Sequence, residues 1–349
     1  MASQDEDVTC FSGAGEVCLR ILIVGLGSIG CRHLSNTRRL QPDAHIIICH
    51  HCRSPQRGTE VDAAADSVVF SVEEALALRP DAAIIANPSP LHVPIAQQLV
   101  EGGVHLLIEK PLSNGLPGVD ALLETCLQRS LVLAVGYSLR FHKPLEVMRQ
   151  AVMEGTIGRP LSIRAAVGQY LPDWRKGMDY RRAVSARRSL GGGALLELSH
   201  ELDYVMWLIG GVTGVLARTE HSGNLEIDVE DVAELVLSFA CGALGSIHLD
   251  MVDRAATRSC RVVGTEGTLD WSEDDSEVKL FSASSGEWRT LLAYRGDDRN
   301  EMYIAELRHF FNCVQGTETP LVDGREGRRV LEVVLAARQS AEWGKVVRL

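Results

Sequence analysis

The chain lacks the features that mark membrane, secreted and nucleic-acid-binding proteins. No apolar run approaches the roughly 20 residues of a membrane span, and the acidic first residues lack the positive end of a signal peptide. We therefore expect a cytoplasmic protein. The net charge of -11 argues against a nucleic-acid partner, because proteins that bind phosphate backbones usually carry excess Lys and Arg.

Paired cysteines are lacking as well. The nine cysteines are scattered along the chain without paired spacing, which favours reduced thiols over a disulfide framework. Cys49, His50, His51 and Cys52 carry metal-ligating side chains, but no second ligand pair follows at a zinc-finger distance. We predict no metal site.

The chain is long, and its first part shows a clear alternation of strands and helices. Its 349 residues favour two domains over a single core. In the first part, apolar strands alternate with helices, which predicts a doubly wound parallel sheet. The strands are expected at residues 20–24, 45–49, 67–70, 82–86, 104–108 and 132–135, and the helices at 72–78, 92–101 and 117–128.

After Phe141 the pattern changes to one long apolar helix, at residues 194–209, and then short strands with glycine turns. This predicts an α/β domain with a large, mostly antiparallel open sheet. Leu235, Leu237 and Phe239 are expected on its open face, buried against a second subunit. We expect a loose extension over residues 1–17, a dinucleotide-binding Rossmann domain over 18–141, and a substrate and oligomerisation domain over 142–349. The later strands are expected at 215–218, 233–239, 243–249, 261–263, 268–271 and 278–281, and the last helices at 300–315 and 324–341.

The first strand ends in a glycine turn of the form G-x-G-x-x-G, and a helical stretch follows it. Such a turn lets backbone N–H groups approach a pyrophosphate and places that anion at a helix N-terminus. The turn therefore predicts a dinucleotide site. Its expected cofactor contacts are Gly25, Gly27, Ser28, Ile29 and Gly30.

Polar residues follow three later strands of the same predicted sheet. Asn87 and Pro88, Glu109 and Lys110, and Tyr137 all stand where a strand ends. Because doubly wound sheets bind ligands at the carboxyl ends of their strands, we expect these residues to line the cofactor crevice.

These motifs, in this order, resemble the Gfo/Idh/MocA family of glucose-fructose oxidoreductases and inositol dehydrogenases. The resemblance covers Arg20 to Leu349 and includes the glycine turn, Asn87-Pro88 followed by His92, Glu109-Lys110-Pro111, residues 136–141, the triple glycine 191–193 before His200 and Asp203, and residues 340–347. It implies hydride transfer between NAD(H) or NADP(H) and a carbon of a sugar, cyclitol or nucleotide sugar. It also implies sheet-to-sheet homodimers or homotetramers. Further residues implied at the site are His92, Trp174 and Arg175 for the cofactor, and Arg140, Tyr180, Arg181 and Asp203 for the substrate.

Oxidising a secondary alcohol needs a base for the hydroxyl proton. Lys110 and His200 are the candidates, and both are also expected to contact the substrate. In a helix over residues 194–209, Glu197, His200 and Tyr204 share one face. We therefore expect His200 to be the main acid/base, Lys110 to share the proton and orient the substrate, and Glu197 to orient His200.

One residue assignment departs from the family pattern, and another stays open. Most family members carry an aspartate four residues before the histidine, whereas here Glu197 precedes His200 by three. For Asp203, a buried structural hydrogen bond at the domain interface is as good an interpretation as a catalytic role.

The cofactor prediction favours NADP(H) over NAD(H). An NAD-selective site usually presents an acid after the second strand, whereas this chain has His50, His51, Cys52, Arg53 and Ser54 there. Arg53 can pair with a 2′-phosphate and Ser54 can donate to it. The alternative is that Arg53 stacks on adenine and accepts either cofactor.

The sequence thus predicts an NAD(P)-dependent dehydrogenase or reductase acting on CH–OH groups of a small sugar-type substrate. Residues 169–175 and 198–203 are similar to members that make unusual sugars, which favours an activated or otherwise anionic sugar. Two alternatives are a catalytically silent dinucleotide sensor and a redox-cycling lyase or glycosidase-like enzyme on the same fold. Lys110 and His200 speak against the sensor, which has no need of an acid/base pair.

Overall fold

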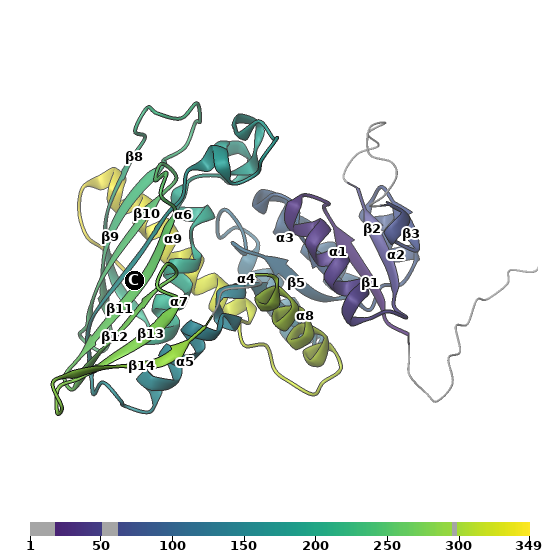
Figure 1. Ribbon diagram of the computed structural model, residues 1–349. Helices are drawn as coiled ribbons and strands as arrows, with labels where there is room; N and C mark the ends of the chain where they lie inside the picture. Colours follow the sequence, from purple (N-terminus) through teal and green to yellow (C-terminus); the bar gives the residue numbers. More distant parts are fainter. Residues whose placement is uncertain (1–17, 51–61, 295–298) are drawn as a thin grey trace, which may run out of the picture.

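Six parallel strands form the first sheet in the computed structural model, which describes residues 18–50, 62–294 and 299–349 (Figure 1). Their order is β3-β2-β1-β4-β5-β6, so the direction of winding reverses between β1 and β4. Ligands bind at that reversal, outside the carboxyl ends of the strands. The elements are β1 (Arg20–Val24), α1 (Ser28–Leu40), β2 (His45–Cys49), β3 (Ser67–Val69), α2 (Val72–Ala77), β4 (Ala82–Ile85), α3 (His92–Glu101), β5 (His105–Glu109), α4 (Val119–Gln128) and β6 (Leu133–Gly136).

The central strands of this sheet are apolar throughout because helices cover both of its faces. Ile21, Leu22 and Ile23 of β1 have no exposed surface, and neither do Ile46, Ile47 and Ile48 of β2. The predicted doubly wound parallel sheet is confirmed. The expected extension over residues 1–17 lies outside the described residues.

A nine-stranded sheet forms the second domain, in the order β14-β13-β12-β11-β7-β10-β9-β8-β15. Only β7 and β10 run parallel; the other neighbours are antiparallel. The predicted mostly antiparallel sheet is thus confirmed. Its strands are β7 (Pro160–Gly168), β8 (Val212–Glu220), β9 (Val232–Phe239), β10 (Leu244–Asp250), β11 (Thr257–Gly264), β12 (Gly267–Ser272), β13 (Glu277–Ser282), β14 (Glu287–Ala293) and β15 (Val347–Arg348).

Helices cover only one face of the second sheet, and the other face is bare (Figure 1). The covering helices are α5 (Lys143–Met153), α6 (Ala194–Glu197), α7 (His200–Ile209) and α9 (Gly324–Trp343). Along β9, Leu235, Leu237 and Phe239 are buried, whereas Val236 is 48% exposed. The expectation that those three residues lie on the open face is therefore wrong. Strand alternation defines two faces, and the helices here bury the more apolar one.

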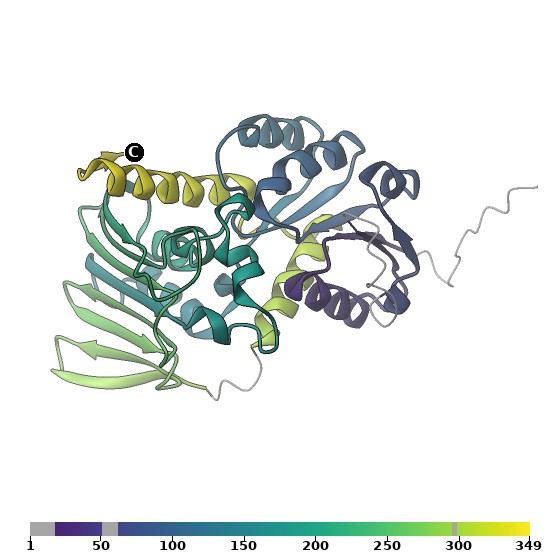
Figure 2. The same ribbon diagram turned by 90° about the horizontal axis from the view of Figure 1, so that it is seen from above.

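The last two helices tie the domains together. Helix α8 (Asn300–Val314) packs on α1, and its Phe310 and Phe311 join the core beneath the first sheet. Helix α9 then runs from the first domain across the second sheet, as Figure 2 shows. At its start, a Cβ on Gly327 would lie 2.6 Å from Val135 of β6, so only glycine permits this approach. None of the helices in the described ranges is long and apolar enough to cross a bilayer.

Candidate active site

The glycine turn after β1 requires glycine for three different reasons. Gly25 has a φ of +88°, and a Cβ there would lie 2.8 Å from the Asn87 nitrogen. A Cβ on Gly30 would lie 1.9 Å from the Gly25 carbonyl oxygen, so this residue lets α1 pack on β1. Around Gly27, by contrast, no atom lies within 4 Å of the Cβ position. That open side is where a ligand can approach the backbone.

The N-terminus of α1 has the properties of an anion site. Gly27 is its N-cap residue, no side chain caps it, and its first turn holds no acidic residue. Ser28 is exposed and Ile29 half-buried at this end. Across the turn, both polar atoms of the Asn87 amide are buried without a hydrogen-bond partner. Free N–H groups at a helix start and an unpaired amide suit a dinucleotide, so the residues present fit this cofactor.

Two of the predicted cofactor residues, Glu109 and His92, make contacts within the protein that hold the crevice together. The Glu109 carboxylate contacts His33 Nε2 at 2.6 Å and accepts a 3.1 Å hydrogen bond from the Lys110 backbone nitrogen. The buried His92 ring lies between two carbonyl oxygens, of Asn87 at 2.7 Å and Pro111 at 3.0 Å. Burial lowers the His92 pKa, so the ring is neutral and donates to one carbonyl at a time. His92 thus joins the loops that follow β4 and β5.

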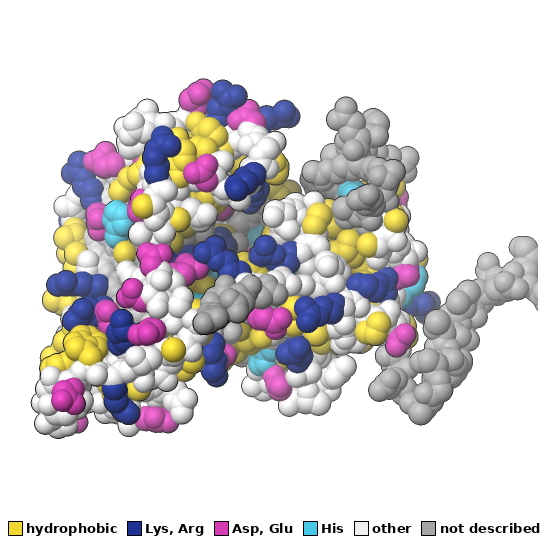
Figure 3. Space-filling view, in the orientation of Figure 1, with side chains coloured by type: hydrophobic (Ala, Val, Ile, Leu, Met, Phe, Trp, Pro, Cys, Tyr) yellow, Lys and Arg dark blue, Asp and Glu magenta, His cyan; other side chains and the backbone are white. Residues whose placement is uncertain are grey.

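The triple glycine 191–193 brings the second domain against this edge. A Cβ on Gly191, whose φ is +82°, would lie 2.1 Å from the Ser89 hydroxyl in the loop after β4. Pro88 is half-buried in the same loop. In the space-filling view, the molecule is hollowed where the two domains meet (Figure 3).

The helix predicted over residues 194–209 is two helices, α6 and α7, separated by Leu198 and Ser199. The Lys110 ammonium donates a 2.7 Å hydrogen bond to the Glu197 carbonyl oxygen, which a continuous helix would use for the Glu201 amide. The Glu201 amide instead reaches Leu198 O at 3.4 Å. A lysine from the other domain therefore accompanies the break.

The break also changes the role expected for Glu197. Its carboxylate accepts a 2.9 Å hydrogen bond from the buried Ser185 hydroxyl. The prediction that Glu197, His200 and Tyr204 share one helical face is wrong, because residues 197 and 200 stand in different helices. Glu197 instead contacts Lys110, through its backbone carbonyl.

His200 begins α7, and its ring meets the Tyr137 ring edge-on, with centroids 5.6 Å apart. The Tyr137 hydroxyl donates to Ser199 at 3.4 Å. Burial is the main cause that lowers the His200 pKa well below 6.5, and the positive charges of Lys110 and Arg258 lower it further. His200 is therefore neutral near pH 7. The structure thus brings Lys110, Tyr137, Glu197 and His200 together.

Arg140 and Asp203 form an ion pair with each other where the two domains meet. The guanidinium donates to both Asp203 oxygens, at 2.7–3.1 Å, and also to Glu326 at 2.9 Å and the Leu321 carbonyl at 3.2 Å. Asp203 has no exposed surface and Arg140 only 2%. This is the buried structural bond that the sequence left open for Asp203. It joins α7, α9 and the loop after β6.

The basic run after β7 forms short 3₁₀ turns near the top of Figure 1. There the Trp174 indole donates to the Gln169 carbonyl at 3.0 Å, and the Tyr180 hydroxyl accepts from the Glu226 amide at 3.2 Å. Arg181 is exposed and paired with Asp179 at 2.8 Å and with Glu226. Half-buried Arg175 makes no ion pair with any described residue.

Arg53 and Ser54, together with His51 and Cys52, lie outside the described residues, which leave out 51–61. No group of three metal-ligating side chains occurs in the part of the chain that the structure describes. Sequence reasoning missed Ser185 and His33, which contact the predicted residues Glu197 and Glu109, and Arg258, whose charge acts on His200. They are far from their partners in the sequence, and no local motif marks them.

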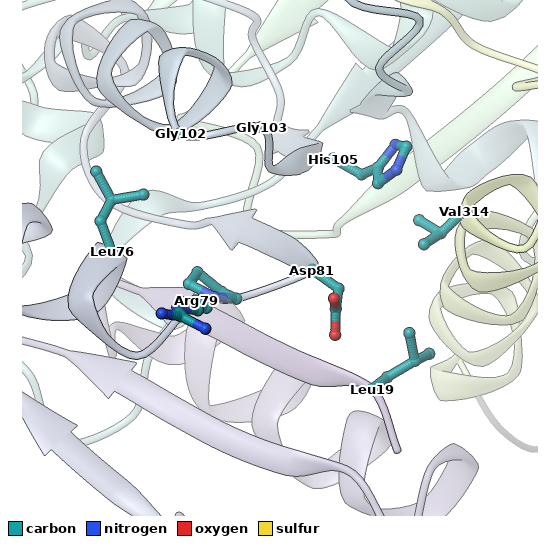
Figure 4. Close-up of a pocket in the computed structure, with 9 residues that line it drawn as sticks. Leu19, Leu76, Arg79, Asp81, Gly102, Gly103, His105 and Val314 are labelled. Atoms are coloured by element: carbon teal, nitrogen blue, oxygen red, sulfur yellow. The ribbon is translucent and has the colours of Figure 1, made fainter. Parts of the chain in front are cut away.

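A second hollow lies at the opposite, amino-terminal edge of the first sheet (Figure 4). Leu19, Asp81 and His105 line it, next to Arg79 and Val314. The Asp81 carboxylate accepts a 2.7 Å hydrogen bond from the Arg20 amide, so it serves the start of β1. This edge is remote from the glycine turn and from Lys110.

Comparison with known proteins agrees with this geometry. Residues 19–137 match the model of an oxidoreductase family's NAD-binding Rossmann fold, and residues 149–349 match that family's C-terminal alpha/beta domain. The chain is 26% identical to myo-inositol 2-dehydrogenase of Thermotoga maritima, over 95% of this chain and 98% of that protein. It is 25% identical to UDP-N-acetylglucosamine 3-dehydrogenase of Acidithiobacillus ferrooxidans, over 93% and 97%. A solved structure of levoglucosan dehydrogenase in complex with NADH has a TM-score of 0.84 at 21% identity, covering 95% of this chain and 99% of that one.

Proposed function

The chain belongs to the Gfo/Idh/MocA family of NAD-dependent sugar, cyclitol and nucleotide-sugar dehydrogenases, and we propose that it interconverts a secondary alcohol and a ketone on an activated or otherwise anionic sugar. The observation that carries the proposal is a neutral His200 beside the Lys110 ammonium, at the sheet edge that holds the glycine turn. A base next to a fixed cation suits the removal of a hydroxyl proton.

In this proposal His200 and Lys110 divide the work on the reacting oxygen. Nδ1 of His200 is buried, so Nε2 is the ring nitrogen left for the substrate, and it takes the hydroxyl proton during oxidation. Lys110, oriented by the Glu197 carbonyl, donates a hydrogen bond to the same oxygen and stabilises the charge that develops there. The nicotinamide ring, when bound, accepts or returns the hydride. Reduction runs the same proton transfer in reverse.

A substrate panel tests this reaction. The enzyme is incubated with sugars, cyclitols and nucleotide sugars, each with NAD⁺ and NADP⁺, while nicotinamide absorbance and substrate loss are both followed. We expect a net absorbance change with at least one anionic or nucleotide-linked sugar. Substrate loss without net absorbance change would favour the redox-cycling alternative, and cofactor binding without turnover on any substrate would favour the sensor.

We also propose a preference for NADP(H) over NAD(H). The support is the sequence after β2, where Arg53 and Ser54 stand and no acid is present. Arg53→Ala is expected to lower kcat/KM with NADP(H) by about tenfold or more, which corresponds to one lost charge-assisted contact, with little effect on NAD(H). A wild-type preference for NAD(H), or equal losses with both cofactors in Arg53→Ala, would contradict this assignment.

A further inference from the structure

Three polar atoms at the start of α7 are buried without a hydrogen-bond partner. They are Nδ1 of His200, Oε2 of Glu201 and the hydroxyl of Tyr204. Tyr204 neighbours both of the other residues on the helix surface, because it stands four residues after His200 and three after Glu201. Buried polar groups in native proteins nearly always have a partner, so each of these three atoms is expected to have one.

Arg258 of β11 reaches the same group of residues from the sheet. Its Nε donates a 2.8 Å hydrogen bond to Oε1 of Glu201, whose side chain is fully buried. This contact fixes one carboxylate oxygen and leaves Oε2 free. Arg258 lies 57 residues beyond Glu201 in the sequence, on the helix-covered face with Cys260 and Val262.

Among the groups around His200, Glu201 is the one whose carboxylate is available to the His200 ring. Lys110 lies on the side of β5 and Arg258 on the side of β11, and both are cations. The Tyr137 ring covers another side, and its hydroxyl is used by Ser199. The Glu197 carboxylate in α6 is occupied by Ser185. Only Glu201, on α7 itself, offers an unused carboxylate oxygen among these described groups.

We propose that Glu201, held by Arg258, is the positioning residue of His200, and that one water molecule shared with Tyr204 joins its Oε2 to His200 Nδ1–H. This inference rests on the proposed function, in which Nε2 of His200 exchanges the substrate proton. A carboxylate on the Nδ1 side fixes the tautomer with Nε2 free and stabilises the imidazolium when the proton arrives. A buried water with three polar partners is an ordinary structural element.

The direct test is ¹⁵N NMR of histidine-labelled enzyme with bound cofactor, the His200 signal being assigned by its loss in His200→Ala. The wild type should show a single neutral tautomer, protonated on Nδ1. Glu201→Gln should give mixed tautomers and a lower His200 pKa, because a negative charge is removed while Arg258 stays. Arg258→Gln should move the pKa upward, because a positive charge is removed. An Nε2–H tautomer in the wild type, or an unchanged tautomer in Glu201→Gln, overturns the proposal.

Kinetics provide the second measurement. Glu201→Gln should lower kcat by about 10- to 100-fold, as loss of an outer hydrogen-bond partner does, while the KM for substrate and the affinity for cofactor stay near wild type. Glu201→Asp, which keeps the charge, should recover part of the loss. The matched control is Glu277→Gln, which removes one carboxylate of an exposed ion pair with Lys279 on β13 and should leave kcat unchanged.

A buried charge left without its partner can prevent folding. If Glu201→Gln does not fold, the double variant Glu201→Gln/Arg258→Met removes both charges and takes its place, with circular dichroism and cofactor binding as folding checks. Wild-type tautomer and kcat in that variant would also overturn the proposal. The NMR readout needs no substrate, so it separates the two ideas: an inactive enzyme with a Glu201-dependent tautomer fails only the proposed function, and an active enzyme with an unaffected Glu201→Gln fails only this inference.

Discussion

At the scale of single residues, the site combines one neutral base with one fixed cation. His200 is kept neutral by burial and by the charges of Lys110 and Arg258, whereas the Lys110 ammonium is fixed by a carbonyl of the other domain. The glycine turn, where we expect the dinucleotide to bind, is built separately from both. Chemistry and cofactor binding are therefore expected to respond to different substitutions.

We expect Lys110→Ala and His200→Ala to reduce turnover by about 10²- to 10⁴-fold, the usual contribution of an acid/base group, with much smaller changes in cofactor affinity. Cofactor titration and steady-state rates on purified variants measure the two effects. Lys143→Ala, which removes an exposed lysine paired with Glu146, is the control and should be unaffected. Near-normal turnover in His200→Ala would remove it from the acid/base role.

Glu306 of α8 is a buried carboxyl group whose two oxygens have no hydrogen-bond partner in the described structure. Burial chiefly, and then the charges of Glu109 and Asp203, raise its pKa well above 4.5. The pKa of Glu306 is therefore higher in the folded protein than in the unfolded chain. Its contribution to the free energy of unfolding is fully present below about pH 4, and this contribution is lost as the pH rises toward the folded pKa.

Glu306→Gln keeps the shape of the side chain but has no proton to lose. We expect it to stabilise the protein at pH 8 by about 1–3 kcal/mol, the cost of an unsatisfied buried group, and to have little effect at pH 4. Thermal unfolding at several pH values measures this. Glu342→Gln, at an exposed position, should show no such pH-dependent gain. A gain for Glu306→Gln that is equal at both pH values would contradict the assignment.

Motifs were the source of the residue-scale predictions for Lys110, His200 and the three glycines, and the roles of these residues stay predictions. Motifs failed for Glu197, because its carboxylate found Ser185 and its carbonyl found Lys110, two partners that lie 12 and 87 residues away in the sequence. Arg258 could not have been found either, since only the folding of β11 beside β7 brings it to α7.

At the scale of elements, the glycine turn separates a structural requirement from a binding one. Gly30 is needed so that α1 can pack on β1, whereas Gly27 meets no protein atom and its φ of -69° suits any residue. The two positions form a matched pair of variants within one turn.

Gly30→Ala should lower Tm sharply, because its methyl group would overlap a backbone carbonyl that cannot move aside. Gly27→Ala should keep Tm near wild type and weaken cofactor binding by about tenfold, equivalent to about 1.4 kcal/mol, because the methyl group occupies the path of the pyrophosphate. Thermal unfolding without cofactor measures the change in Tm, and a cofactor titration measures the change in affinity. Equal cofactor affinity in Gly27→Ala and wild type would argue against this binding mode.

Helices and strands with strong periodicity were predictable, including all six strands of the first sheet. Three strands were missed, β7, β14 and the two-residue β15. Strand β7 is at the centre of the second sheet, but its two inner alanines and its Arg164 give a weak β signal, and its burial comes from neighbours distant in the sequence. The break between α6 and α7 was equally hidden, because the lysine that accompanies it comes from another domain.

At the scale of the whole molecule, a single chain crosses between the domains three times. Helix α8 lies within the stretch expected for the second domain, yet it packs on α1, and α9 then returns across the second sheet. Apolar periodicity shows that these helices have a buried face. Periodicity does not indicate which sheet that face packs against. For the same reason, the prediction from periodicity placed the apolar residues of β9 on the wrong face of the sheet.

The bare face of the second sheet carries its own exposed apolar residues. Leu216 and Val236 are opposite each other on β8 and β9, 42% and 48% exposed, and Leu244 on β10 is 56% exposed. Because exposed apolar residues gathered on one sheet face often mark an interaction surface, we expect this face to be covered by another subunit. A two-fold axis would let this face pair with the same face of a second copy.

We therefore expect the wild type to be a dimer or a dimer of dimers, and Val236→Asp to shift it toward monomer, because each interface would then bury two unpaired carboxylates. Light scattering at micromolar concentration measures the mass of both. Leu127→Asp is the matched control, since Leu127 on α4 is also exposed, at 61%, but belongs to the first domain; it should leave the mass unchanged. A wild type that is a monodisperse monomer would contradict the expected assembly. A Val236→Asp variant that keeps the wild-type mass would place the interface elsewhere and leave the apolar residues of this sheet face facing solvent.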